Sequence, residues 1–216
     1  IGEDAFAACV LLEEIVVPEG VTTINAHAFM SCTSLDALYL PSTVQYLGGS
    51  YIGDMFEMTG VVGSANLQKV VMSEDNPYFS SHDGLLYNKA GTEVLFCPRG
   101  RTSAEVMEGT TKIGDYAFFF CLGLEDVKLP ESLETIGSSA FAVCEGLRSI
   151  DIPDNVSYIG DNALGSCVNM ADIKLPSGLK TIGKMAFGGC DEVTEITLPE
   201  GVTAIGDNAF YVSSKL

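Results

Sequence analysis

Six of the seven cysteines in this chain of 216 residues fall into two series with the same interval of 23 residues. The first series is Cys9 and Cys32, and the second is Cys121, Cys144, Cys167 and Cys190. An interval repeated over so much of a chain predicts stacked copies of one structural unit, in which each copy buries its apolar side against its neighbours.

Alignment on this interval gives eight blocks that open with variants of I-G-x-x-A-F-x-x-C-x-x-L-x-x-I-x-L-P. The blocks begin at Ile1, Ile24, Leu47, Ile113, Ile136, Ile159, Ile182 and Ile205. The apolar spacing L-x-x-I-x-L predicts a short parallel strand in each block, as in leucine-rich repeats, whose period is roughly 20 to 29 residues. Proline ends strand pairing because it has no N–H group. Six prolines directly follow these segments: Pro18, Pro41, Pro130, Pro153, Pro176 and Pro199.

Glycine stands second in seven of the eight blocks, and Asn25 takes its place in the other. Both residues tolerate a positive φ, which predicts a left-handed turn at this position. An Ala-Phe pair follows, preceded in four blocks by Asp4, Asp115, Asp161 or Asp207. Aspartate is a good helix N-cap, so the segment predicts one or two turns of helix.

These blocks resemble the BspA-like class of leucine-rich repeat over nearly the whole chain. The resemblance implies a surface or secreted bacterial protein associated with adhesion to host proteins or other cells. No catalytic residue is associated with the repeat in that class, so the resemblance implies none here. We predict an α/β repeat fold, a right-handed leucine-rich-repeat solenoid of roughly nine coils (216/23), with parallel strands on the concave face and short helices or turns on the convex face.

Residues 1–216 are predicted to form one leucine-rich-repeat domain, with regular repeats at 1–46 and 113–216 and an irregular insert at 47–112. Within the insert, Asp83–Tyr87 and Glu93–Phe96 flank a glycine-containing loop, which predicts a β-hairpin. We interpret the insert as a feature that recurs among BspA-like proteins.

The insert also holds the only sequence patterns that suggest a reaction or an ion. Ser80, Ser81, His82 and Asp83 contain the residue types of a hydrolase, but adjacent residues of one loop seldom converge on a substrate. Asp75, Asn76 and Asp83 leave open a weak calcium site, although they lack the spacing of an EF-hand loop. We expect no catalytic residue, no cofactor and no specific metal site.

The periodic cysteines are predicted to be free, buried thiols that resist labelling. Their side chains would point in parallel on successive coils, which is poor geometry for disulfides. The chain has no C-x-x-C pair and no histidine placed as a zinc ligand beside the periodic cysteines, so zinc is disfavoured. Cys97 lies outside the period, and His27 is expected on the outer surface.

The chain carries 11 basic and 29 acidic residues, a formal charge of −18. This balance repels phosphate backbones and anionic lipid headgroups, so nucleic acid is excluded as a partner. Direct membrane insertion is not expected either, because no apolar run approaches about 18 residues. No signal peptide opens the chain, although secretion or surface display is what the family resemblance implies.

The predicted strands turn the two neighbours of each central apolar residue outward, onto the concave face. We predict that these residues form a ligand-binding surface: Glu14, Val16, Ala37, Tyr39, Asp126, Lys128, Ser149, Asp151, Asp172, Lys174, Glu195 and Thr197. One column of this surface is acidic. In the other, Lys128, Asp151 and Lys174 are expected to face one another across neighbouring strands. The alternative is a solvated sheet whose charges keep the protein soluble.

We therefore predict a noncatalytic module that binds a protein or glycan, such as host extracellular matrix or mucin, on a secreted or surface-displayed bacterial protein. A structural spacer that positions other domains is the alternative, and a hydrolase in the insert is a distant third. The chain starts at the opening of a block and ends inside one, so we expect a fragment of a longer protein. Exposed terminal coils would favour end-to-end self-association.

Overall fold

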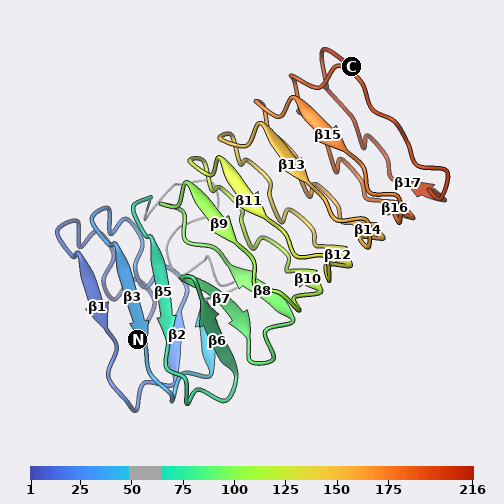
Figure 1. Ribbon diagram of the computed structural model, residues 1–216. Coiled ribbons are helices and arrows are strands. Elements are labelled where there is room, and N and C mark those ends of the chain that lie inside the picture. Colours follow the sequence, from blue (N-terminus) through green and yellow to red (C-terminus); the bar gives the residue numbers. More distant parts are fainter. Residues whose placement is uncertain (49–64) are drawn as a thin grey trace. The chain divides into compact units, whose positions relative to one another are not determined.

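The structure, a computed structural model, describes residues 1–48 and 65–216 and contains strands and turns but no helix in those ranges (Figure 1). The fold is a parallel-strand leucine-rich-repeat solenoid of about eight coils. The strands are β1 (Glu14–Val16), β2 (Thr23–Asn25), β3 (Ala37–Leu40), β4 (Tyr46–Gly48), β5 (Lys69–Met72), β6 (Phe79–His82), β7 (Leu85–Asn88), β8 (Glu93–Phe96), β9 (Ser103–Glu105), β10 (Lys112–Ile113), β11 (Asp126–Lys128), β12 (Thr135–Ile136), β13 (Ser149–Asp151), β14 (Tyr158–Ile159), β15 (Asp172–Lys174), β16 (Thr181–Ile182) and β17 (Ala204–Ile205).

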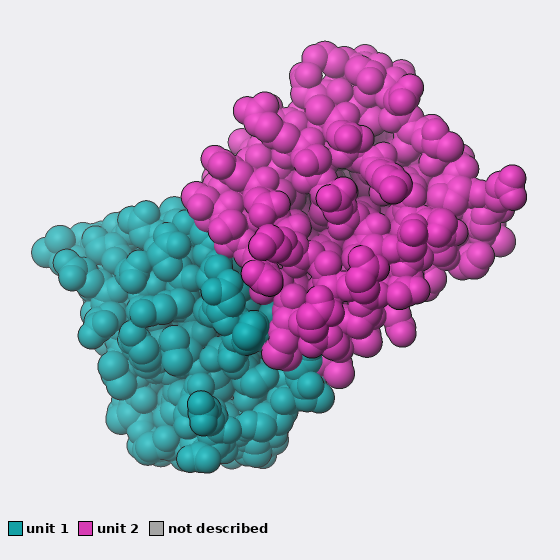
Figure 2. Space-filling view, viewed as in Figure 1, with its two compact units in different colours: residues 1–91, 95–101 teal, residues 92–94, 102–216 magenta. Residues whose placement is uncertain are grey.

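The described residues form two compact units, coloured separately in Figure 2. Unit 1 contains residues 1–91 and 95–101, and unit 2 contains residues 92–94 and 102–216. Part of the predicted insert, residues 49–64, lies outside the described residues.

A first column of strands follows the L-x-x-I-x-L segments. In unit 1 it is the parallel sheet β1-β3-β5, and in unit 2 it is the parallel pairs β9–β11 and β13–β15. Partners in β13 and β15 are offset by 23 residues, as Ser149 pairs with Asp172. No strand pairing joins β11 to β13, so the two pairs remain separate sheets.

A second column of strands, which the sequence analysis did not predict, contains the residue that opens each block after the first. It comprises β2 and β4 in unit 1, and β10, β12, β14, β16 and β17 together with the first two residues of β8 in unit 2. Each pair is parallel and places one apolar residue above the next, as Ile136 pairs with Ile159, while Leu47 and Val94 take the place of isoleucine in two pairs. The second column continues from β10 to β17, so it joins the coils also where β11 and β13 are not paired.

The Ala-Phe segments form turns, and the predicted helices are absent from the described residues. Tyr116 and Phe120 have φ angles of 60° and 61°, in the left-handed region, and the same two positions are left-handed in other coils. Alternate N–H groups bond to the next coil instead of four residues back, as the N–H of Phe118 does to the carbonyl of Ala140 at 2.7 Å. Bonding between coils thus replaces the local bonds of a helix.

The block glycines do not form the predicted left-handed turn, except at Gly48, whose φ is 77°. They are needed because successive coils approach each other closely. A Cβ atom on Gly183 would lie 2.4 Å from the carbonyl carbon of Gly160 and 2.5 Å from the nitrogen of Asp161. Glycine recurs at this position because the backbone of the neighbouring coil leaves no room for a Cβ atom, and not because the position requires a positive φ.

The aspartates that follow these glycines are not helix N-caps. The carboxylate of Asp115 accepts a hydrogen bond from the N–H of Ser138 at 2.8 Å, and that of Asp161 from the N–H of Lys184 at 2.7 Å. Each bond spans 23 residues and joins one coil to the next.

The core consists of the periodic apolar residues stacked on themselves. Ala140, Phe141, Cys144, Leu147 and Ile150 belong to one coil and are each exposed by 3% or less. The rings of neighbouring coils stack, since the centroids of Phe118 and Phe141 are 4.7 Å apart. Burial of each large side chain contributes about 1.5–3 kcal/mol, shared along the column.

The irregular stretch contains an antiparallel hairpin, β6–β7, joined at Asp83 and Gly84. Both residues have positive φ, 47° and 76°, as a two-residue type I′ turn requires. The sheet order places β8 next to β7. The sequence analysis placed Asp83 and Gly84 at the start of a strand. An Asp-Gly pair is typical of a two-residue hairpin turn, and this indication of the turn was missed.

Candidate binding face

The outward side of the first strand column, called the strand face here, is well defined in unit 2. In β11, β13 and β15 the central residues Val127, Ile150 and Ile173 are at most 6% exposed. Their six neighbours are exposed and point to solvent: Asp126, Lys128, Ser149, Asp151, Asp172 and Lys174. Alternation along each strand therefore produces the surface that the pattern predicts.

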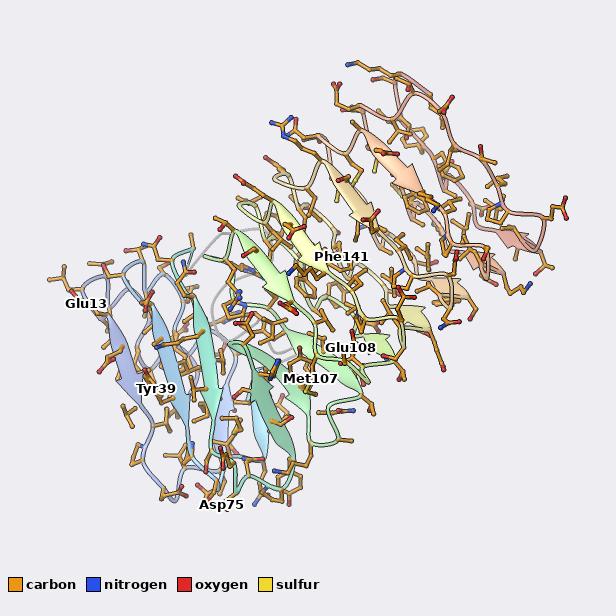
Figure 3. The ribbon with its side chains drawn as sticks, in the orientation of Figure 1. Glu13, Tyr39, Asp75, Met107, Glu108 and Phe141 are labelled. Carbon is orange, nitrogen blue, oxygen red and sulfur yellow. The ribbon has the colours of Figure 1, made fainter. Side chains whose placement is uncertain are left out.

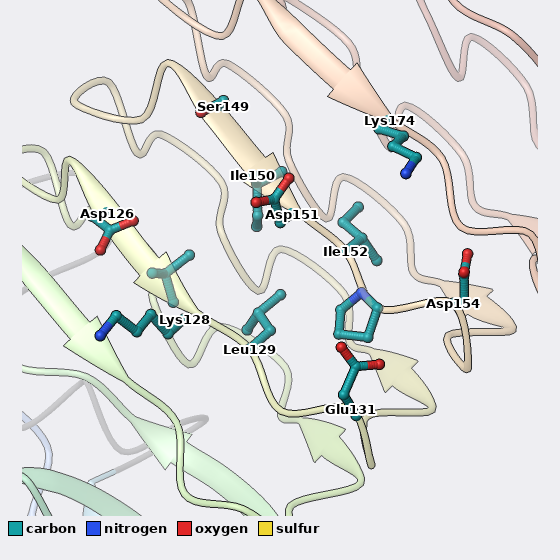
Figure 4. Close-up of a pocket in the computed structure, with 12 residues that line it drawn as sticks. Asp126, Lys128, Leu129, Glu131, Ser149, Ile150, Asp151, Ile152, Asp154 and Lys174 are labelled. Carbon is teal, nitrogen blue, oxygen red and sulfur yellow. The ribbon is translucent and has the colours of Figure 1, made fainter.

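Two adjoining hollows lie on this face. The first, of about 520 Å³, lies between β11 and β13 (Figure 4). It is lined by Asp126–Leu129, Glu131, Ser149–Asp154 and Lys174. The second, of about 670 Å³, extends from β15 to the segment 195–199 and shares Asp151, Asp154 and Lys174 with the first. None of the described residues that line the two hollows is aromatic.

The prediction for the charges of the face is confirmed in part, since Asp151 lies in register with Lys174 on the neighbouring strand. Lys128 does not face Asp151, because β11 and β13 are not paired. Its Nζ atom lies 3.7 Å from a carboxylate oxygen of Glu105 on β9 instead. Asp126, Asp151 and Asp172 form no ion pair with any residue in the described ranges.

Asp154 binds the following coil at the edge of both hollows. Its carboxylate accepts a hydrogen bond from the N–H of Ser177 at 2.8 Å. This bond, the Ser177 hydroxyl and the charge of Lys174 together hold the pKa of Asp154 below its usual value. Asp154 therefore stays ionised and keeps the rim of the face negative.

Three predicted residues differ from this arrangement. Ala37 is 2% exposed and offers almost no surface, because it lies in register between the longer side chains of Glu14 and Lys69. Glu195 and Thr197 are exposed, but the strand expected around them is not formed.

In unit 1 the strand face carries an apolar and aromatic spot. Val16 is 68% exposed and lies in register with Tyr39 on β3 (Figure 3). The Nζ atom of Lys69 lies 5.5 Å from the centre of the Tyr39 ring, a cation–π contact. Interaction with Tyr39 is the largest cause of a raised pKa at Lys69. A separate hollow of about 460 Å³ is lined by Glu13, Glu14, Ser34, Asp36 and Asn66.

The residues of the imagined hydrolase have other structural roles. The Ser80 hydroxyl donates to the carbonyl of Asn88, and the Ser81 hydroxyl accepts from the N–H of Met72. Asp83 forms an ion pair with Arg101 at 2.6 Å. These residues therefore do not come together as a nucleophile, base and orienting acid.

Asn76, one of the residues of the possible calcium site in the insert, also has another structural role. Asn76 is fully buried, and its amide nitrogen donates to the carbonyls of Pro41 and Val44 at 3.3 and 2.7 Å. Its side-chain oxygen accepts from the N–H groups of Tyr78 and Phe79, both at 2.8 Å. All hydrogen-bonding groups of this amide are occupied, so it anchors the loop to the core.

One group of metal-ligating residue types occurs at the surface of unit 1, where Glu3, Asp4 and His27 place ligand atoms within 4.8 Å of one another. The Nδ1 atom of His27 lies 3.5 Å from Glu3. The two carboxylates are exposed, and exposed acidic groups commonly lie together without an ion.

The periodic cysteines are free thiols, and all except Cys9 are buried, as is Cys97. Each of four thiols lies 3.0–3.4 Å from the carbonyl oxygen of the residue 26 positions earlier, to which it donates: Cys32, Cys144, Cys167 and Cys190. Ser213 makes the same bond to Phe187 in the last coil. The prediction of a buried position was wrong for Cys9, which is exposed.

A family model for the BspA type leucine rich repeat region matches residues 1–82 and 95–216 in six copies. No curated protein matches the chain. Among the residues that the structure describes, no helix is long and apolar enough to cross a membrane.

Several solved structures share the fold. The pneumococcal vaccine antigen PcpA is 23% identical, with a TM-score of 0.60, over 95% of this chain and 60% of that one. A leucine-rich repeat protein of T. pallidum is 25% identical, with a TM-score of 0.52, over 94% of this chain and 78% of that one. A leucine-rich cell surface protein of Faecalibacterium prausnitzii is 20% identical, with a TM-score of 0.52, over 97% and 65%. The chain thus spans about 60% of the length of PcpA.

Proposed function

Because the chain belongs to the BspA-type leucine-rich repeat family, we propose that it is a noncatalytic binding module of a secreted or surface-displayed bacterial protein. Its repeats are of a kind that generally carries no catalytic residue. The names of two structural neighbours, a vaccine antigen and a cell surface protein, support a location at the surface. The ligand of this module is a protein or a glycan. The module serves adhesion to host extracellular matrix, mucin or neighbouring cells.

The observation that supports the proposal is the solvent-facing strand face of unit 2 with its two adjoining hollows. Repeat proteins commonly bind partners on such extended faces. The exposed side chains of β11, β13 and β15 make few bonds among themselves, so they remain available to a ligand.

The test is a binding screen of the 216-residue chain against immobilised extracellular-matrix proteins and mucin glycans. Reversal of charge in the variant Asp126→Lys/Asp172→Lys/Glu195→Lys should abolish binding of any ligand that uses the strand face. The variant Glu108→Lys/Glu134→Lys/Asp207→Lys is the matched control, since these exposed residues line neither hollow.

A structural spacer is the second candidate, favoured by the same exposed charges, which would then serve only solubility. If the screen finds no ligand, the spacer function is supported and the binding function is contradicted. If a ligand binds both charge-reversed proteins and the parent equally, the strand face of unit 2 is not the binding surface.

A further inference from the structure

The gap between β11 and β13 leaves backbone groups of two strand edges without ladder partners. In a parallel ladder, the N–H and C=O groups of alternate residues face opposite neighbours. The N–H of Asp126 bonds to Thr102 on the β9 side, so the backbone groups of Val127 face β13. The N–H of Asp172 bonds to Arg148 in the same way, so Ser149 and Asp151 face β11.

No strand pairing closes this gap, and the hollow of about 520 Å³ lies over it. Peptide groups at a strand edge need hydrogen-bond partners, either water or a ligand. The floor of the hollow therefore offers carbonyl acceptors as well as side chains.

Carboxylates dominate the walls. The residues that line the two hollows include six acids, Asp126, Glu131, Asp151, Asp154, Asp172 and Glu195, and two bases, Lys128 and Lys174. The six acids minus the two bases leave four negative charges. Lys128 is already close to Glu105, outside the lining, so its charge does little to offset the acids of the hollow.

We infer that the strand face of unit 2 binds a basic polypeptide segment, whose lysine or arginine side chains donate to the carboxylates of Asp126, Asp151 and Asp172 and to strand-edge carbonyls. This inference rests on the proposed function and names the chemistry of its ligand. Lysine and arginine carry only donors, while ionised carboxylates and carbonyls are acceptors, so the two surfaces are complementary.

The composition of the hollows argues for a peptide over a carbohydrate. Sugar rings are commonly held by stacking on aromatic side chains, and the lining of the two hollows contains no aromatic residue within the part of the chain that the structure describes. Acidic mucin sugars would be repelled by the surplus of carboxylates. A basic protein segment gains from the same surplus.

The test is titration of the whole chain with a fluorescein-labelled octalysine peptide, with octaglutamate as the control peptide. Octalysine should bind, more weakly as salt rises, and octaglutamate should not. The variant Asp126→Asn/Asp151→Asn/Asp172→Asn should weaken octalysine binding about tenfold. The variant Glu108→Gln/Glu134→Gln/Asp207→Asn removes the same number of charges away from the hollows and should change binding less than twofold.

A third variant separates specific binding from general attraction. Lys174→Gln removes a positive charge from both hollows and should strengthen octalysine binding about threefold. Circular dichroism checks that each variant keeps its fold. Equal weakening by the two triple variants, or no gain from Lys174→Gln, would overturn the inference.

The inference and the proposed function fail in different ways. If the screen finds a glycan that binds the strand face while octalysine does not compete, the basic-peptide inference is wrong and the binding function stands. If matrix proteins bind the parent chain and are displaced by octalysine but not by octaglutamate, both are supported. If the screen finds no ligand, the binding function itself is contradicted.

Discussion

The thiol of Cys144 donates a hydrogen bond to the backbone carbonyl of Phe118, 3.1 Å away and 26 residues earlier in the chain. The repeated cysteine is therefore a small apolar residue that also satisfies a backbone acceptor of the preceding coil. A serine makes the same bond at Ser213, which shows that the donor is part of the requirement.

Replacement of Cys144 by alanine should lower the free energy of unfolding by about 1–2 kcal/mol, because it removes both packing and the donor. Cys9→Ala is the matched control at the same position of the motif, where the residue is exposed, and should cost less than about 0.5 kcal/mol. Urea denaturation measures both. Equal losses would show that the bond between coils contributes nothing.

Thiol labelling should separate one cysteine from six. Cys9 is exposed and should react with a maleimide within minutes, while Cys32, Cys97, Cys121, Cys144, Cys167 and Cys190 are buried and should react only in denaturant. Intact-mass spectrometry counts the labels with time. Rapid addition of a second label to the native protein contradicts the buried column.

Alkaline pH should destabilise the protein through the same thiols. Burial raises the pKa of Cys190 to about 12 and raises that of Cys167 as well, whereas unfolded cysteine titrates near about 8.5. The stabilisation is complete below the unfolded pKa and is lost as pH rises above it, because only the unfolded thiols ionise. Each should contribute at most about 1.4 kcal/mol per pH unit.

The measurement is the free energy of unfolding between about pH 8 and 9.5, before most lysines and tyrosines titrate. The double variant Cys167→Ala/Cys190→Ala should show a shallower decline than the parent. Parallel curves would mean that these two thiols do not determine the alkaline stability.

Gly183→Ala should destabilise the chain by about 3 kcal/mol, because the new methyl group would meet the backbone of the preceding coil at 2.4 Å. Gly2→Ala occupies the equivalent place in the first block, where a Cβ atom meets nothing within 4 Å, and should be nearly neutral. Both substitutions reduce the conformational entropy of the unfolded chain equally. A difference between the melting temperatures of the two variants therefore measures the steric contact between coils at residue 183.

Asn76→Ala should cost about 3 kcal/mol or more, because two carbonyls and two N–H groups would lose their partner in the core. Asn76→Asp retains an acceptor but directs a buried charge at the carbonyls of Pro41 and Val44. Its stability should therefore rise as pH falls and the carboxyl group becomes protonated. Asn155→Ala, at an exposed asparagine, is the control. A pH-independent Asn76→Asp variant would contradict this role.

The local pattern predicted most of the buried residues of the coils, with Cys9 and Ala37 as exceptions. Alternation in L-x-x-I-x-L correctly turned Ile150 inward and its two neighbours outward. The stacked coils and most of the first strand column followed from the spacing of the cysteines, glycines and prolines, and the family from the resemblance of the repeated block.

The errors arose where contacts between coils decide the conformation. The N–H of Phe118 bonds to the next coil, so a segment with helix signals forms turns. Gly183 is selected by a neighbour 23 residues away and not by its own φ. The same reason explains why the unpaired edge between β11 and β13 was not foreseen, since no local pattern reports whether two coils separate.

Carboxylates such as Asp115 and Asp161 hold each coil to the next across a constant step of 23 residues. Addition or deletion of one residue within a regular coil would put every column beyond it out of register. Length can therefore change by duplication or loss of whole coils, or by an excursion such as the β6–β7 hairpin. The gene of such a protein is expected to evolve by recombination between repeats, with the number of coils varying more readily than the length of any one of them.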